Sequence, residues 1–216
     1  WERFSSLKTA AGRLIDSLGA SDPNNTFSVV SFSSDDKYAG GSGGAGTYVR
    51  AKTVSAASAK ATVNGLVAAT SGGTDYFSAF RRIDDCCVDD KENIVLFLTD
   101  GEPTSVPKDV LWRDMGSTAQ SVVAVAWTRY AAEHRLAKVK GFYSVFIGTN
   151  TGSSSVLSMI TRATKISDED RASVQASSDA EMQALVDALS KRLKKPSISV
   201  AMEDQLSDYV RYEGTP

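Results

Sequence analysis

Residues 92–102 have the sequence ENIVLFLTDGE, and this stretch decides the fold class. Five consecutive apolar residues, 94–98, are too many for a strand with one face in water, and the Thr-Asp-Gly that follows ends the run abruptly. The stretch therefore predicts a strand of a parallel sheet that is buried on both faces. Asp100 follows the carboxyl end of this strand, where open α/β sheets bind their ligands. An Asp-Gly pair also suits a simple turn, so a purely structural role for Asp100 stays open.

Helical and strand patterns alternate along the rest of the chain. The patterns predict strands at residues 26–32, 47–53, 93–98 and 142–147, and helices at residues 1–18, 55–69, 75–88, 117–138, 156–163 and 180–193. This alternation predicts a doubly wound, mostly parallel α/β sheet with helices on both faces.

Two segments fall outside the alternation. Residues 39–46 contain only Gly, Ser and Ala, which predicts a flexible surface loop. Residues 197–202 follow Pro196 and alternate like a strand that starts something new. We therefore assign residues 1–195 to one domain and residues 196–216 to the start of a following β-rich segment.

The pattern opens with a helix, whereas a fold of this class begins with a strand that feeds the first helix and usually lies at the centre of the sheet. Without that strand the sheet would fall into two halves with unpaired backbone groups, each costing about 1 to 3 kcal/mol if buried. We therefore expect a strand to precede Trp1 in the natural protein, so that the chain as given is truncated at its N-terminus.

Composition excludes several classes of function. The 216 residues carry 24 basic and 26 acidic side chains with no long run of one sign, which does not favour binding to nucleic acid. No stretch approaches the roughly 18 apolar residues of a membrane helix. The two cysteines, Cys86 and Cys87, are adjacent and could close only a strained ring, so two buried thiols are favoured over a metal or redox pair.

Two loops carry oxygen side chains suited to a metal ion. In residues 71–75, SGGTD, the glycines allow a tight turn and Thr74 presents a hydroxyl just before a helix, although Thr74 or Asp75 could instead only cap that helix. In residues 98–104, LTDGEPT, Asp100 presents a carboxylate at the edge of the sheet. Such hard oxygen ligands suit Mg²⁺ or Mn²⁺ held with several waters, and a carboxylate of a partner can complete the shell.

Signs of catalysis are weaker. His134 is the only histidine and lies in a helical pattern, which favours a surface position. The acidic pairs at residues 84–85 and 89–90 are typical of solvated turns near a helix end. The sequence contains no Gly-x-Ser-x-Gly elbow, Cys/His pair or phosphate-binding loop. We therefore expect a protein that is not an enzyme.

The two loops resemble parts of a known site. GGTD at residues 72–75 and LTDGE at residues 98–102 resemble the second and third parts of the metal-ion-dependent adhesion site (MIDAS) of von Willebrand factor A domains. Residues 1–11 resemble the first helix of that family and residues 27–33 its second strand, so the resemblance extends over residues 1–193. It implies that Thr74 binds the metal through its hydroxyl and that Asp100 binds it directly or through water.

The first MIDAS motif, Asp-x-Ser-x-Ser, is absent from the chain and would fall immediately before Trp1. Since that motif supplies most of the metal-binding oxygens in the family, the resemblance implies weak or absent binding of Mg²⁺ or Mn²⁺ by residues 1–216 alone.

The tail narrows the expected function. Residues 197–200 and 204–210 resemble the segment after the A domain in surface adhesins of Gram-positive bacteria, including pilus-tip proteins. The resemblance implies an extracellular, non-enzymatic adhesion domain on the cell wall or a pilus, with a host or extracellular-matrix protein, a glycan or pilus subunits as partners. Two alternatives are an intracellular A domain that assists an ATP-driven chelatase-type complex, and a Mg²⁺-dependent doubly wound enzyme that uses Asp100.

Overall fold

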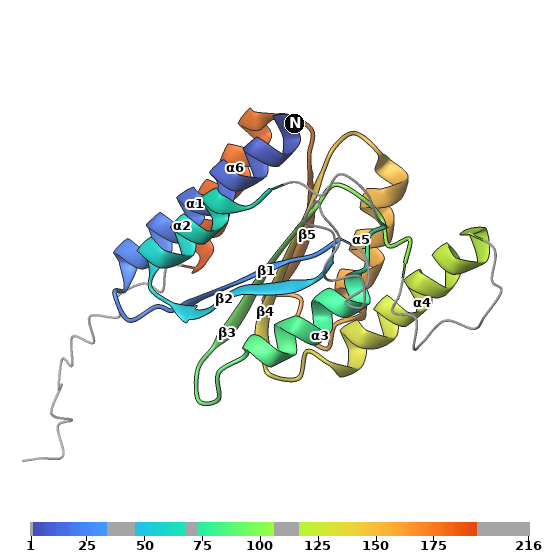
Figure 1. Cartoon of the computed structure of the whole chain (residues 1–216), viewed down its shortest axis with the longest axis horizontal. Coiled ribbons are helices and arrows are strands. Elements are labelled where there is room, and N and C mark those ends of the chain that lie inside the picture. The colour runs from blue at the N-terminus through green and yellow to red at the C-terminus, as the bar shows by residue number, and fades with distance from the viewer. Residues whose placement is uncertain (1, 34–45, 68–72, 106–116, 194–216) are drawn as a thin grey trace, which may run out of the picture.

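The chain's long apolar strand β4 (Val139–Ile147) lies in the middle of a three-stranded parallel sheet. In the computed structural model, which describes residues 2–33, 46–67, 73–105 and 117–193, β3 (Asn93–Thr99) pairs with one edge of β4 and β5 (Arg171–Ala176) with the other (Figure 1). β1 (Phe27–Ser31) and β2 (Tyr48–Val54) form a separate antiparallel pair. The described strands therefore form two sheets.

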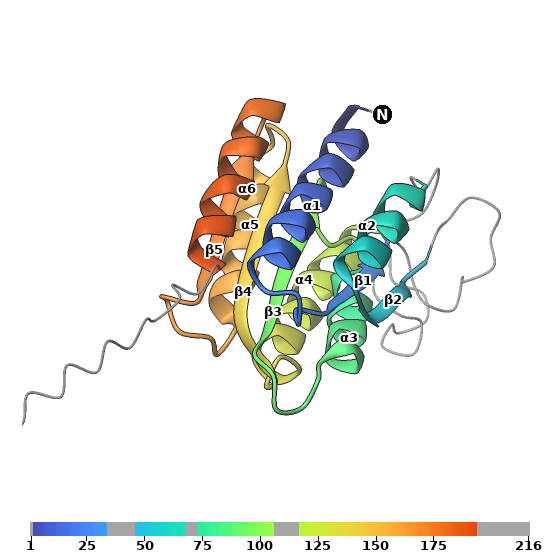
Figure 2. The same cartoon turned by 90° about the vertical axis from the view of Figure 1, so that its left-hand side faces the viewer.

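The helices lie in two layers on opposite sides of the strands. Figures 1 and 2 show α1, α2 and α6 on one side and α3, α4 and α5 on the other. Their bounds are α1 (Glu2–Ser21), α2 (Ala56–Gly65), α3 (Tyr76–Cys86), α4 (Ser117–His134), α5 (Thr151–Ala163) and α6 (Asp179–Leu193). The predicted α/β fold, a parallel sheet flanked by helices, is confirmed.

Side chains of β4 alternate between two cores. Phe142 and Phe146 pack with α3, α4 and α5 on one face, whereas Tyr143, Val145 and Ile147 pack with α1 and α6 on the other. All five side chains are buried. An apolar run without alternation is what a parallel strand covered by helices on both faces requires.

β3 departs from its prediction. We expected residues 94–98 to be buried on both faces, but Ile94 is 45% exposed and only Phe97 and Thr99 of this strand are fully buried. The reason is that, among the described strands, β3 has a neighbour on one edge only, so its apolar side chains are not enclosed from both sides as those of β4 are. The cluster around Phe97 nevertheless anchors β3, because its ring lies against those of Phe80 and Phe142.

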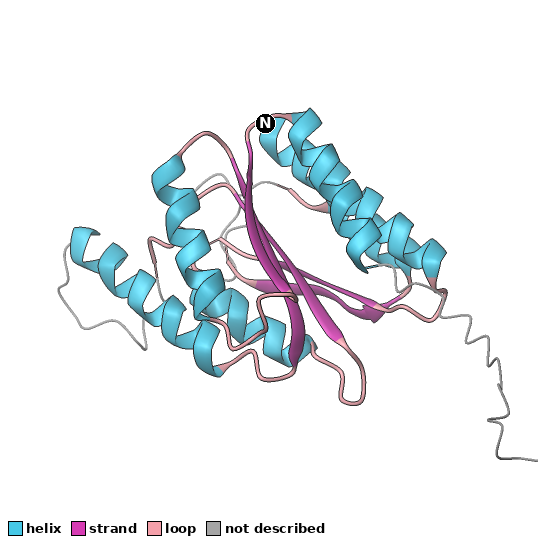
Figure 3. Ribbon diagram, turned by 180° about the vertical axis from the view of Figure 1, so that it is seen from behind, coloured by secondary structure: helices cyan, strands magenta, loops and turns pink. Residues whose placement is uncertain are grey.

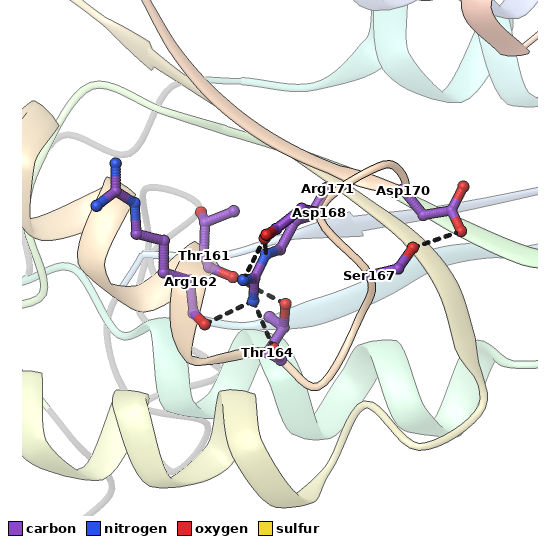
Figure 4. Close-up of polar contacts among 7 residues, drawn as sticks. All are labelled: Thr161, Arg162, Thr164, Ser167, Asp168, Asp170 and Arg171. Carbon is purple, nitrogen blue, oxygen red and sulfur yellow. Dashed lines mark hydrogen bonds and ion pairs between the residues drawn. The ribbon is translucent and has the colours of Figure 1, made fainter.

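β5 was not predicted at all, since its sequence RASVQA carries no run of apolar residues. Its strand conformation comes from pairing with β4, in a parallel register that places Val174 opposite Val145. Arg171 fixes the start of the strand (Figure 4). Its guanidinium donates to the carbonyls of Arg162, at 2.6 Å, and Thr164, at 2.8 Å, and pairs with Asp168.

Smaller differences concern helix ends. α5 begins at Thr151 rather than at residue 156, because Asn150 caps it by accepting a hydrogen bond from the Ser153 amide at 3.2 Å. α2 ends at Gly65, four residues before the predicted end. Residues 39–45 of the expected loop at residues 39–46, and all of the expected strand at residues 197–202, lie outside the described residues.

Cys86 and Cys87 are free, partly buried thiols at the end of α3. Burial raises the pKa of both thiols. Within the described residues, no helix is long and apolar enough to cross a membrane.

Candidate functional site

The loops that carry Thr74 and Asp100 lie against each other beyond the carboxyl end of β3. The Thr74 carbonyl accepts hydrogen bonds from the amides of Thr104, at 2.9 Å, and Ser105, at 3.2 Å, and the Thr74 amide donates to the Thr104 hydroxyl at 2.9 Å. A Cβ placed on Gly101 would lie 3.1 Å from the Thr74 hydroxyl oxygen. We call residues 73–75 together with residues 99–105 the rim.

The end of β1 reaches the same place. The Asp75 amide donates to the Ser33 carbonyl at 2.6 Å, two residues beyond the last residue of β1. β1 and β3 therefore finish at the same edge of the molecule, the edge at which ligands bind to open α/β sheets.

Tyr76, which follows the first loop, hydrogen-bonds to the second loop. This first residue of α3 is fully buried, and its hydroxyl hydrogen-bonds to the Thr99 hydroxyl, at 3.1 Å, and to the Gly101 carbonyl. Burial raises the pKa of Tyr76 above its usual value, and the carboxylates of Asp100 and Glu102 raise it further, while the bond to Thr99 acts in the opposite direction. Thr99 and Gly101, which flank Asp100 in the chain, both contact the Tyr76 hydroxyl, so Asp100 lies close to the start of α3.

Asp75 caps the N-terminus of α3, and the side chain of Thr74 takes no part in this capping. The Asp75 carboxylate accepts from the Ser78 amide at 2.9 Å and from the Ser78 hydroxyl at 2.6 Å. Of the two residues that could have capped this helix, Asp75 therefore takes the structural role, and the Thr74 side chain stays available at the partly exposed surface.

The turn after β3 is likewise made without the side chain of Asp100. The Thr99 hydroxyl donates to the Gly101 carbonyl at 3.0 Å and accepts from the Gly101 amide at 3.3 Å. Asp100 itself is exposed. A carboxylate that the turn does not use is free to serve a ligand.

These residues fit part of the coordination shell of a divalent cation. A threonine hydroxyl and a carboxylate are hard oxygen donors suited to Mg²⁺ or Mn²⁺. Beside them, the buried Ser105 hydroxyl has no hydrogen-bond partner. Within the described part of the chain, however, no three His, Cys, Asp or Glu side chains gather as a metal site. The rim therefore offers the Thr74 hydroxyl and the Asp100 carboxylate, with the Ser105 hydroxyl beside them, and waters or oxygens from elsewhere would have to supply the rest.

Other candidates lie away from the rim. His134 is an exposed residue whose ring stacks on Tyr130 with centroids 4.3 Å apart, which confirms its predicted surface position. Asp89 pairs with Lys138 at 2.8 Å on the surface. A hollow of about 480 Å³ between α4 and α5 is lined by neither Thr74 nor Asp100.

Sequence reasoning placed Thr99 in the second loop but did not predict its bond to Tyr76, and it singled out neither Tyr76, which lies next to the rim, nor Ser105. A polar aromatic residue in the first turn of a helix, two positions after Thr74, was the available signal for Tyr76. Ser105 had none, because its place beside Gly73 depends on how the two loops meet.

A parallel sheet flanked by helices, with oxygen side chains at the carboxyl edge, is the arrangement of a von Willebrand factor A-like fold. Two solved structures of proximal thread matrix protein 1 (PTMP1) from the mussel byssus have a similar fold. One matches with a TM-score of 0.57 and 15% sequence identity, and the other, with a zinc-occupied MIDAS motif, with a TM-score of 0.56 and 16% identity.

Each match covers 88% of this chain and 43% of the PTMP1 chain, so the chain spans less than half the length of the structures it matches. No family model and no curated protein matches the chain. At these identities the similarity establishes the fold.

Proposed function

We propose that this chain is a non-enzymatic ligand-binding domain in which a divalent cation at the rim links Thr74 and Asp100 to an acidic group of a partner. The observation that carries the proposal is the meeting of these two loops at the carboxyl edge of the sheet, with capping and turn formation assigned to other residues. The zinc-occupied MIDAS motif of PTMP1 supports it, because that protein has the same kind of fold.

The chemistry of the rim favours binding over turnover. A cation held by few protein ligands keeps coordination positions for waters and for a carboxylate of the partner. The one histidine lies on the surface of α4, in contact with Tyr130 and Glu133. The described residues of the rim therefore provide no general base of the common histidine type.

We further propose that the domain acts outside the cell, on the wall or a pilus of a bacterium, and that it binds a host or extracellular-matrix protein or glycan. This part of the proposal rests on the resemblance of residues 197–200 and 204–210 to the segment after the A domain of surface adhesins.

A metal titration followed by thermal unfolding tests the cation site. Mg²⁺, Mn²⁺ and Zn²⁺ should each be added to the 216-residue chain and to the natural protein with the residues expected before Trp1, which we call the full-length protein. We expect a rise in melting temperature of the full-length protein that grows with metal concentration, because a ligand that binds the folded state stabilises it, and a much smaller rise in the 216-residue chain.

Variants assign the effect to the rim. Thr74→Ala and Asp100→Ala should each remove most of the metal-dependent gain in the full-length protein. Glu169→Gln, which removes an exposed carboxylate away from the rim, should keep it. A full-length protein indifferent to all three metals, or one whose gain survives both rim substitutions, would refute the proposal.

A further inference from the structure

The hollow between α4 and α5 is a feature that the proposed cation site does not use. Its volume of about 480 Å³ falls within the range of roughly 300 to 1,000 Å³ that is typical of small-molecule sites. Figure 3, which views the molecule from behind, shows the two helices side by side on one side of the strands. α5 begins just after the end of β4 and runs away from that edge of the sheet, so Arg162, in its last turn, lies toward the edge opposite the rim.

One face of α5 forms most of the lining of this hollow. Its members occupy positions i, i+3, i+4 and i+7, which lie on the same side of a helix: Ser155, Ser158, Met159 and Arg162. Arg129 of α4 contributes to the lining from the neighbouring helix. Two guanidinium groups, two hydroxyls and one thioether therefore border a single hollow.

The two arginines carry positive charge that neighbouring residues compensate only in part. α5 contains no acidic residue, and the acidic residue of α4 is Glu133. Arg129 contacts Glu133 at 3.4 Å on the surface, and such exposed pairs contribute little energy. Arg162 forms no ion pair within the described part of the chain, and Figure 4 shows its guanidinium directed away from Asp168, which pairs with Arg171 instead. The hollow therefore favours an anionic ligand.

The end of α5 that carries Arg162 is fixed before any ligand binds. The Arg171 guanidinium donates to the carbonyls of Arg162, at 2.6 Å, and Thr164, at 2.8 Å. The Thr164 hydroxyl in turn donates to the Thr161 carbonyl at 2.8 Å. Because these bonds already order the last turn of α5, little backbone entropy is lost when Arg162 binds a ligand.

The two serines of the hollow offer a ligand different chemistry. The Ser155 hydroxyl donates to the Thr151 carbonyl at 2.8 Å, so only its lone pairs remain, and these accept a hydrogen bond. The half-buried Ser158 hydroxyl makes no hydrogen bond within the described residues, so it is able to donate. An anionic group accepts from Ser158 and from the guanidiniums but has no use for Ser155, whereas a hydroxyl of the same ligand would donate to Ser155.

We propose that the hollow between α4 and α5 binds a sugar that carries an anionic ester group, either a phosphate or a sulfate. The ester oxygens accept from the guanidiniums of Arg129 and Arg162 and from the Ser158 hydroxyl, and a ring hydroxyl donates to Ser155. An ester of this kind presents three terminal oxygens where a carboxylate presents two, which matches three donors on two helices. Met159, which is 38% exposed, offers an adaptable surface to the apolar face of the sugar ring.

Amide NMR spectra of the 216-residue chain, recorded with a metal chelator in the buffer, test this site. The two probes are glucose-6-phosphate and glucose-6-sulfate, and the comparison ligands are glucose, glucuronate and inorganic phosphate. We expect at least one of the two esters to shift the amides of α4 and α5 saturably, with a dissociation constant of about 1 mM or tighter. Glucose should give no saturable shift, and glucuronate and inorganic phosphate should bind at least about tenfold more weakly than that ester. The ester that binds more tightly identifies the anionic group.

Substitutions assign the binding to the hollow. Arg129→Gln and Arg162→Gln should each weaken binding of the ester by at least about tenfold, because each removes a charged hydrogen-bond donor. Ser155→Ala should weaken binding of the sugar ester by about threefold to tenfold and leave that of inorganic phosphate unchanged. Arg13→Gln, at an exposed position on α1 in the other helix layer, is the matched control and should change affinity by less than about twofold. All four side chains are exposed, and thermal unfolding checks that each variant folds.

The proposal fails if neither ester shifts the amides of α4 and α5 saturably, or if the substitutions of Arg129 and Arg162 act no more strongly than Arg13→Gln. It also fails if inorganic phosphate binds as tightly as the sugar ester, which would mean a site for a plain anion, or if glucuronate does, which would mean a site for a carboxylate. None of these titrations contains a metal, so the cation site and the sugar site can fail independently.

Discussion

Replacing Tyr76 with phenylalanine removes a buried hydroxyl that links the start of α3 to the loop after β3. Tyr76 is fully buried and hydrogen-bonds to the Thr99 hydroxyl at 3.1 Å and to the Gly101 carbonyl. The one hydroxyl proton of Tyr76 is shared between these two acceptors, so the two contacts together contribute about 0.5 to 1.5 kcal/mol, and burial favours the upper end. The Thr99 hydroxyl still donates to the Gly101 carbonyl, at 3.0 Å, which limits the loss. We therefore expect a decrease of about 1.5 kcal/mol in the free energy of unfolding at pH 7.

The pH dependence of this loss provides a second test. In the unfolded chain a tyrosine ionises near pH 10. In the folded protein burial raises the pKa of Tyr76, so the unfolded state loses its proton first, and the stability that the raised pKa confers below pH 10 is lost as the pH rises. At pH 11 this loss is about 1.4 kcal/mol and affects only the wild-type protein. The difference in stability between wild type and Tyr76→Phe should thus nearly close at pH 11.

Urea unfolding at pH 7, 9, 10 and 11, with both proteins measured side by side, gives this difference directly. Titration of the other tyrosines and of the lysines affects both proteins and cancels. Tyr130→Phe, at a half-exposed position on α4, is the matched control and should change stability by less than about 0.5 kcal/mol at pH 7. A Tyr76→Phe difference that stays constant from pH 7 to pH 11 would refute the reasoning.

Two other substitutions test how the rim and β5 are held. Gly73→Ala should lower the free energy of unfolding by about 1 to 3 kcal/mol in thermal or urea unfolding, because the new Cβ would lie 2.8 Å from the Ser105 hydroxyl oxygen. Gly65→Ala is the control: its new Cβ would have no neighbour within 4 Å, so the change should be neutral or stabilising. Arg171→Lys should cost about 1 to 2 kcal/mol, because an ammonium cannot hold two carbonyls and a carboxylate with the same planar fork. Arg162→Lys should change stability by less than about 0.5 kcal/mol, since only the backbone carbonyl of that residue takes part in the cluster; equal effects of the two arginine substitutions would contradict this account.

The sequence by itself determined the fold class and the two loops of the candidate site. Five apolar residues that end in Thr-Asp-Gly predict a strand of a parallel sheet, although β3 is less buried than predicted. Alternating helical and strand patterns leave few arrangements other than a doubly wound sheet. Thr74 and Asp100 were singled out as candidates for the same reason, because each lies at a break in a strong local pattern. These patterns are formed by residues that are neighbours in the chain, so they can be recognised in a single sequence without knowledge of the tertiary structure.

Tertiary structure decided everything that depends on partners distant in the chain. β5 is a strand because β4 offers it a backbone edge, although RASVQA has no strand pattern of its own. Only the meeting of the two loops shows that Asp75 takes the capping role and that Tyr76 joins Thr99 to Gly101. The incomplete burial of β3 likewise depends on which strands lie beside it. Burial and hydrogen bonding are properties of a residue's neighbours, and neighbours in space are fixed only when the whole chain has packed.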